Sequence, residues 1–137
     1  MPKTFTRRTS LFPPQTTEVQ FDEKWAFVGK KEQHCDPDEP ADRHCGDNWD
    51  HVAYDPEHKL VVAVVPGKRT KANTRRLVKE FHRRTGGQPM RLMTSDEYKP
   101  YREAIVEAYG EPFARPRQGR RGRHPKPGRR PPENLLY

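Results

Sequence analysis

Alternating apolar and polar residues predict three strands in the first half of the chain. Val19 to Lys30 alternates along its length, and Trp49 to Tyr54 is a second, shorter strand. Leu60 to Val65 is apolar at every position, as in a central strand that is covered on both faces. Asp55 and Pro56 between the last two strands favour a type I turn. We therefore expect an antiparallel meander.

After the third strand the hydrophobic period changes from two to about 3.6, which predicts a helix. Thr70 is its expected N-cap and Gly86 ends it. Met90 to Thr94 is a short buried strand, and Pro100 to Tyr109 is an amphipathic helix that Gly110 terminates. A helical crossover should bring this fourth strand in parallel to a neighbour, so the sequence predicts an α/β fold with a mixed sheet.

Two aspartates occupy positions that a core normally excludes. Asp22 lies in the first strand, opposite the face that carries Trp25 and Phe27, which we expect in the core. Asp96 falls in the turn between the fourth strand and the second helix, at the strand end where sites form in open sheets. A buried carboxylate needs a partner such as a metal ion. Alternatively, Asp22 is a strand-edge residue facing water and Asp96 is a helix N-cap.

The composition limits the chain to one small domain with short flanks. It has 137 residues, of which 31% are hydrophobic and 34% charged. We expect a flexible leader at 1–16, a folded unit at 17–111 and a basic, largely disordered arm at 112–137. No apolar stretch approaches the roughly 20 residues that span a bilayer, and no signal segment is evident, so we expect a cytoplasmic protein without a membrane partner.

The net charge of +8 is concentrated in the arm, which carries eight basic residues against Glu133 as the one acid, a balance of +7. Such a segment cannot bury enough apolar surface to fold alone, and it suits a phosphate backbone. A solvated linker is the alternative. The candidate nucleic-acid-binding residues are Arg115, Arg117, Arg120, Arg121, Arg123, Lys126, Arg129 and Arg130.

Four ordered blocks resemble a known family. They are D-E-K-W-A-F-V-G-K-K from Asp22, W-D-H-V-A-Y-D from Trp49, V-P-G-K-R-T from Val65 and T-S-D-E-Y-K-P-Y from Thr94. Together they are similar to the catalytic domain of small bacterial insertion-sequence transposases of the DDE class, over about residues 17–111. The resemblance implies a ribonuclease H-like fold, with the first acid on the first strand and the second after the fourth.

Those positions match Asp22 and Asp96, the candidate catalytic and metal-binding residues. The resemblance implies that they hold two Mg²⁺ or Mn²⁺ ions, which activate the attacking oxygen and stabilise the leaving oxygen in DNA strand cleavage and transfer. The partner is then DNA, with DNA transposition and recombination as the process.

The family's third acid, a glutamate after a fifth strand, has no convincing match. Glu103 and Glu107 are weak candidates, because solvent exposure alone explains their helical positions. Residues 135–137 resemble the start of the absent fifth strand. We therefore expect a truncated catalytic domain with little or no transposase activity on its own, which pairs with the missing C-terminal part or with a full-length transposase.

Two other classes remain open. One is a non-catalytic nucleic-acid-binding protein that uses the basic arm, and the other is a fragment that binds an intact transposase and poisons it. His34, Cys35, His44 and Cys45 lack the spacing of a zinc knuckle, so a plain polar loop with reduced cysteines is expected, with a structural zinc as the alternative. Lys68 and Arg69 are expected in a solvated turn, with phosphate contact as the alternative.

Overall fold

A four-stranded sheet with two helices forms the body of the protein. The computed structural model describes residues 15–116, 119, 122 and 124–137, so the leader falls almost wholly outside the described residues. The elements follow one another as β1 (Glu18–Val28), the 3-10 helices η1 (Glu32–His34) and η2 (Pro40–His44), β2 (Gly46–Asp55), β3 (Leu60–Gly67), α1 (Lys71–Arg84), β4 (Leu92–Ser95), α2 (Pro100–Tyr109), β5 (Glu111–Phe113) and β6 (Gly128–Arg130).

The strand order in the main sheet is β3-β2-β1-β4. β1, β2 and β3 pair antiparallel, which confirms the predicted meander, and β4 pairs in parallel with β1, which confirms the crossover. On the other side of β4, Leu136 forms an isolated parallel bridge with Leu92. Two hydrogen bonds hold it, from Met93 N to Leu136 O (2.9 Å) and from Leu136 N to Arg91 O (3.0 Å).

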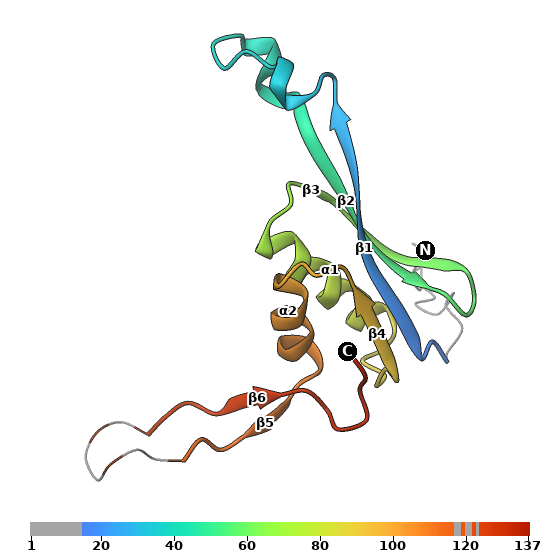
Figure 1. Ribbon diagram of the computed structural model, residues 1–137, viewed down its shortest axis with the longest axis vertical. Coiled ribbons are helices and arrows are strands. Elements are labelled where there is room, and N and C mark those ends of the chain that lie inside the picture. Colours follow the sequence, from blue (N-terminus) through green and yellow to red (C-terminus); the bar gives the residue numbers. More distant parts are fainter. Residues whose placement is uncertain (1–14, 117–118, 120–121, 123) are drawn as a thin grey trace, which may run out of the picture.

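The core lies between the sheet and the helices (Figure 1). Phe21 of β1 stacks on Tyr101 of α2 (5.5 Å between centroids) and meets Phe81 of α1 edge-on (5.6 Å). The Thr70 side chain caps α1 by accepting a hydrogen bond from Asn73 N (3.3 Å). Among the described residues no helix is both long and apolar enough to cross a bilayer.

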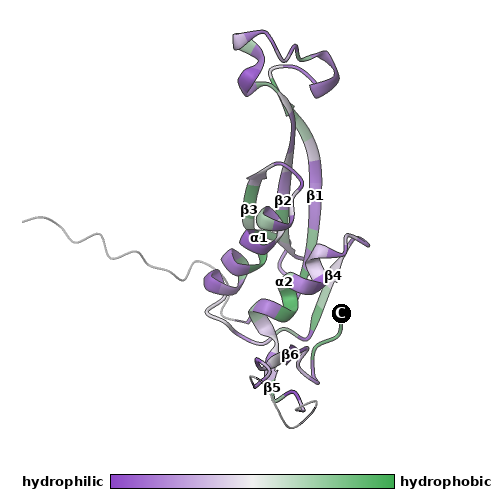
Figure 2. Ribbon diagram, turned by 90° about the vertical axis from the view of Figure 1, so that its left-hand side faces the viewer, coloured by the Kyte–Doolittle hydropathy of each residue, from purple (hydrophilic) through white to green (hydrophobic). Residues whose placement is uncertain are grey.

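β3 lies at an edge of the sheet, so the prediction of a central strand covered on both faces is wrong. Val61 and Val64 are 52% and 48% exposed. Figure 2 shows β3 as a hydrophobic strand and α1 as a largely hydrophilic helix on its visible side. An apolar run indicates a strand, but it does not say which neighbours that strand has.

Trp25 and Phe27 are also outside the core, contrary to the prediction, with exposed fractions of 41% and 47%. β1 and β2 continue beyond the other strands as a two-stranded ribbon that ends in η1 and η2 (Figure 1). The alternation of apolar and polar residues in β1 therefore continues into a part of the strand that no helix covers.

The basic arm contains a two-stranded pair that the sequence did not predict. β5 and β6 are antiparallel, with Phe113 opposite Gly128 and Glu111 opposite Arg130. The Arg129 side chain donates a hydrogen bond to the backbone oxygen of Glu107 in α2. Of the predicted nucleic-acid-binding residues, four lie outside the described residues, namely Arg117, Arg120, Arg121 and Arg123.

Candidate metal and nucleic-acid site

Asp22 and Asp96, called the aspartate pair below, lie next to the point where the pairing of β1 with β4 ends. The last register pair joins Phe21 to Ser95, and each aspartate is the next residue of its chain. Asp96 therefore follows the carboxyl end of β4, and Asp22 lies in the part of β1 beside it, since neighbouring strands are about 5 Å apart. Both residues are exposed. The structure thus brings together two residues that are 74 positions apart.

The two aspartates differ in how their alternative roles fare. The N-cap of α2 is Lys99, with no side-chain capping bond, so Asp96 is not an N-cap. β1 pairs with β4 only as far as Phe21, so Asp22 lies where that side of β1 is open, and its side chain is exposed, as in the alternative of a strand-edge residue facing water. Its Oδ1 accepts a hydrogen bond from Glu23 N (2.7 Å) just where pairing with β4 ends.

Glu23 and Arg69 form an ion pair behind the aspartates. Glu23 Oε2 accepts a hydrogen bond from Arg69 Nε (2.7 Å), and the Glu23 side chain is 1% exposed. The guanidinium group lies over the rings of Trp49 (5.3 Å) and Tyr98 (4.3 Å). Arg69 is exposed in the connection after β3, as the sequence predicted, but its ion pair with Glu23 was not predicted. Lys68 forms an exposed ion pair with Glu32 (2.5 Å).

Three buried polar side chains meet on this side of the sheet. Glu23 lies opposite His51 in the register of β1 and β2, and Tyr101 of α2 is 0% exposed. Burial is the first cause that raises the pKa of Tyr101, followed by the charges of Glu23, Asp22 and Asp96. The Tyr101 hydroxyl is buried and has no hydrogen-bond partner among the described residues. The carboxylates of Glu23, Asp22 and Asp96 are all close enough for their charges to affect the Tyr101 hydroxyl.

Four residues near this site were not among the predicted site residues, although they share a sequence signal. They are Glu23, His51, Arg69 and Tyr98. Each belongs to one of the four blocks that carry the family resemblance, and each block contributes a residue to this cluster. Hydrophobic periodicity contains no information about such pairing, because Glu23 and Arg69 are 46 residues apart. The blocks themselves were the available signal.

The glutamates of α2 are engaged elsewhere. Glu103 pairs with Lys71 (2.8 Å), and Glu107 pairs with Lys79 (2.8 Å) and Arg75 (3.1 Å). The hydrogen bond from its lysine is the main cause that lowers the pKa of each glutamate. Within the described part of the chain, no group of three His, Cys, Asp or Glu side chains is arranged to hold a metal ion.

The aspartate pair by itself fits a hard divalent cation. Carboxylate oxygens are the preferred protein ligands of Mg²⁺, which is commonly held by one or two carboxylates together with water and substrate phosphates. The pair offers exposed oxygens from adjacent strand ends and leaves the remaining coordination positions for such ligands. The donor set is compatible with the ions that the resemblance implies, with one carboxylate fewer than the family's three.

The loop at the tip of the ribbon contains two free thiols, Cys35 and Cys45. Cys35 Sγ donates to Lys31 O (3.4 Å), and burial is the first cause that raises the pKa of this thiol. An ion pair between Lys30 and Asp42 (2.7 Å) connects the start of the loop, just after β1, to η2. This network is a local one, at the opposite end of β1 from the core.

The described basic residues of the arm lie at the other end of the molecule. α2 begins just after Asp96 and has 10 residues, so it takes the chain about 15 Å from the aspartate pair before β5 starts. Figure 1 shows β5 and β6 at the end of the body opposite the ribbon. Four exposed cations lie in this part of the arm: Arg115, Lys126, Arg129 and Arg130.

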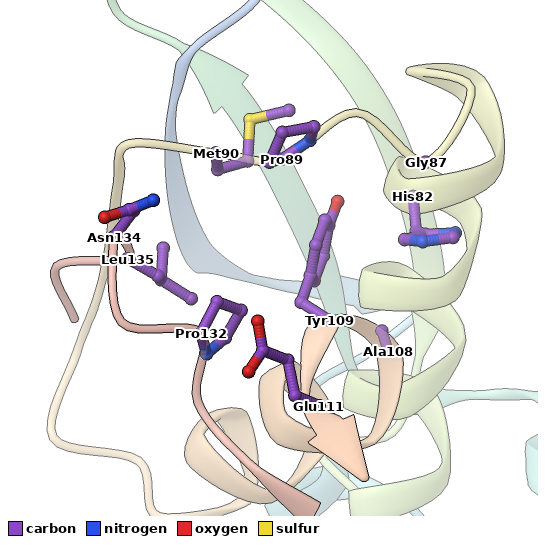
Figure 3. Close-up of a pocket in the computed structure, with 10 residues that line it drawn as sticks. All are labelled: His82, Gly87, Pro89, Met90, Ala108, Tyr109, Glu111, Pro132, Asn134 and Leu135. Atoms are coloured by element: carbon purple, nitrogen blue, oxygen red, sulfur yellow. The ribbon is translucent and has the colours of Figure 1, made fainter.

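A cavity of about 320 Å³ also lies at this far end, lined by α1, α2 and the last residues of the chain (Figure 3). Tyr109 points into it and meets His82 edge-on, with 4.8 Å between ring centroids. Burial raises the pKa of Tyr109. The cavity is separate from the aspartate pair, because its lining residues come from the carboxyl end of α2 rather than from the turn before it.

No protein-family model, no curated protein and no solved structure matches this chain.

Proposed function

We propose that this chain is a catalytic-domain fragment of a DDE-type transposase with a ribonuclease H-like fold. The aspartate pair binds divalent metal ions, Mg²⁺ or Mn²⁺, at a site for a DNA strand. The fragment has little or no strand-cleavage activity on its own, because the described residues supply two of the three carboxylates that this class uses.

The observation that carries this proposal is the pairing of β1 with β4. The two aspartates were selected from the sequence as family positions, and the register makes them neighbours at the carboxyl edge of the sheet. The mixed sheet, in which β4 is parallel to β1, is consistent with the proposal, and Leu136 forms a parallel bridge beside β4, where a fifth strand is expected.

The chemistry follows from what the chain's residues can do. When bound, the metal ions activate the attacking oxygen and stabilise the leaving oxygen of a phosphodiester. Asp22 and Asp96 hold the ions and, being exposed, leave room for a DNA strand. The buried Tyr101 and the Glu23–Arg69 pair keep the strand ends in position behind them. Catalysis of this kind depends on positioning and charge and needs no covalent nucleophile.

Calorimetric titration with Mn²⁺ tests the metal site. We expect binding that weakens at least about tenfold in Asp22→Asn and in Asp96→Asn, because each loses a charged ligand. Asp38→Asn is the matched control, since Asp38 is an exposed aspartate in the distant loop. Equal Mn²⁺ affinity in all three variants and the wild type would overturn the proposal.

A nicking assay tests the expected inactivity. The purified chain should leave supercoiled DNA intact in Mg²⁺, within the sensitivity of the gel. Robust Mg²⁺-dependent nicking that Asp22→Ala abolishes would show that the chain needs no further carboxylate. The same assay on a mixture with a full-length transposase tests whether the chain inhibits an intact enzyme.

A non-catalytic nucleic-acid-binding protein is the second candidate, favoured by the exposed cations of the arm. In that case DNA affinity falls steeply with salt and does not depend on divalent ions or on the aspartate pair. Comparing DNA affinity with and without Ca²⁺, in the wild type and in Asp22→Asn, separates the two candidates.

A further inference from the structure

We propose that Arg69 binds a backbone phosphate of the DNA strand at the aspartate pair. Glu23, Trp49 and Tyr98 act as positioning residues that hold its guanidinium group. This inference rests on the proposed function and assigns to it the phosphate contact that the two carboxylates cannot make.

The guanidinium group is held on one edge and against two aromatic rings. Glu23 Oε2 accepts from Nε, and within the described residues it is the one hydrogen-bonded partner of Arg69. The rings of Trp49 and Tyr98 lie 5.3 and 4.3 Å from the guanidinium carbon. Because the plane is fixed, both terminal nitrogens are oriented in advance, which lowers the entropy lost when they bind a phosphate.

The held group remains accessible. The Arg69 side chain is 39% exposed, whereas the Glu23 carboxylate that holds it is 1% exposed. An arginine with a free, planar pair of nitrogens is the usual side chain for bidentate phosphate recognition.

Arg69 also lies at the same end of the sheet as Asp96. It follows β3, which runs in the same direction as β1 and β4 because β2 is antiparallel to both β1 and β3. The hydrogen bond to Glu23 is the main cause that raises the pKa of Arg69, and the charges of Tyr98 and Asp96 add to it. The cation therefore lies within electrostatic range of Asp96.

The local charge gives a reason for such a contact. Asp22, Asp96 and Glu23 place three carboxylates near Tyr101, and a DNA phosphate approaching them is repelled. Arg69 already neutralises one of the three, because it pairs with Glu23 through Nε. Its terminal nitrogens are not used by that bond and can donate to a phosphate.

A charge-neutral double variant tests the inference. Glu23→Gln with Arg69→Gln removes an ion pair without changing the net charge. Glu18→Gln with Arg91→Gln is the matched control, because that ion pair lies at the other end of β4, roughly 16 Å from Asp96. The measurement is the affinity of a short labelled DNA duplex as a function of salt in the presence of Ca²⁺.

We expect the slope of log affinity against log salt to fall by about 0.9 in the Glu23/Arg69 variant and to stay unchanged in the control, since one phosphate contact is lost. An unchanged slope in the Glu23/Arg69 variant, with Asp22-dependent Ca²⁺ binding intact, would overturn the role of Arg69 and leave the proposed function standing. Ca²⁺ binding that does not depend on Asp22 would overturn both.

Arg69→Lys provides a test that does not depend on removing the buried pair. Lysine keeps the charge but lacks the planar fork, so DNA affinity should fall about fivefold or more with little change in slope. Thermal melting of each variant verifies folding. Affinity equal to that of the wild type in a folded Arg69→Lys variant would contradict the inference.

Discussion

Asp55 shows how a single buried carboxylate shapes the turn between β2 and β3. It is 0% exposed, and its Oδ1 accepts hydrogen bonds from Glu57 N (2.9 Å) and His58 N (3.0 Å). Its Oδ2 accepts from Thr16 Oγ1 (2.9 Å) and lies 2.8 Å from His58 Nδ1. Burial opposes the charge, but the bonds from His58 and Thr16 outweigh it and lower the pKa of Asp55.

We predict that Asp55→Ala lowers the free energy of unfolding by about 2 to 3 kcal/mol at pH 7, because four hydrogen-bonding groups, of which Thr16 Oγ1 is buried, lose their acceptor. The folded pKa is below the unfolded value, so this contribution is complete above about pH 4 and declines as the pH falls through that value. Urea denaturation at several pH values measures it. Asp38→Ala, at an exposed position, is the control, and an equal effect of the two substitutions would contradict the prediction.

Single residues differ in how far the sequence predicts them. Asp22 and Asp96 could be selected because aspartate is unusual in and directly after strands, and the family blocks connect them. Arg69 was assigned to a solvated turn from its place after the third strand, and its pairing with Glu23 of another strand could not be predicted. A tertiary ion pair of this kind leaves no trace in local propensity.

At the scale of elements, ion pairs between residues of α1 stabilise this helix. Arg83 and Arg84 both bond to Glu80, at 2.6 and 2.7 Å, one helical turn away. These hydrogen bonds lower the pKa of Glu80 from 4.5 to about 2. The depressed pKa means that the pair stabilises the folded helix above about pH 4.5 and loses this effect as the pH falls towards 2.

We predict that Glu80→Gln lowers the free energy of unfolding by about 0.5 to 1 kcal/mol at pH 7, the size of two surface pairs on a helix. The difference from the wild type should become much smaller near pH 2, where about half of the wild-type carboxylate is protonated. Thermal melting at both pH values measures this effect, with the exposed Glu133→Gln as control. A difference that persists in full at pH 2 would mean that packing, not charge, is responsible.

Elements with clear boundary residues were predicted well. The predicted second helix has the same bounds as α2, because Pro100 and Gly110 mark its ends. β2 begins at Gly46, earlier than predicted, since the residues before Trp49 are polar and pair only with the exposed end of β1. β5 and β6 were not predicted, because prolines and arginines carry no alternating pattern.

At the scale of the whole molecule, the aspartate pair and the basic arm lie at opposite ends of α2. This separation predicts two independent contributions to DNA binding, one dependent on divalent ions and one dependent on salt alone. The sequence predicted both features but not their separation, which follows from the direction of α2 relative to β4.

We predict that replacing the four described cations of the arm, Arg115, Lys126, Arg129 and Arg130, with glutamine reduces the salt slope of DNA binding by up to about 3.6. Mn²⁺ affinity should not change, because the arm lies about 15 Å or more from the aspartate pair. Fluorescence anisotropy and calorimetry measure the two quantities. A parallel loss of Mn²⁺ affinity would contradict the separation of the two sites.

The central claim is that Asp22 and Asp96 share divalent metal ions, and an anomalous difference map from a crystal soaked in Mn²⁺ tests it most directly. We predict a peak within about 2.0 to 2.4 Å of a carboxylate oxygen from each aspartate, and no such peak in Asp22→Asn crystals. Mn²⁺ bound elsewhere, with the space between these two carboxylates empty, would contradict the account.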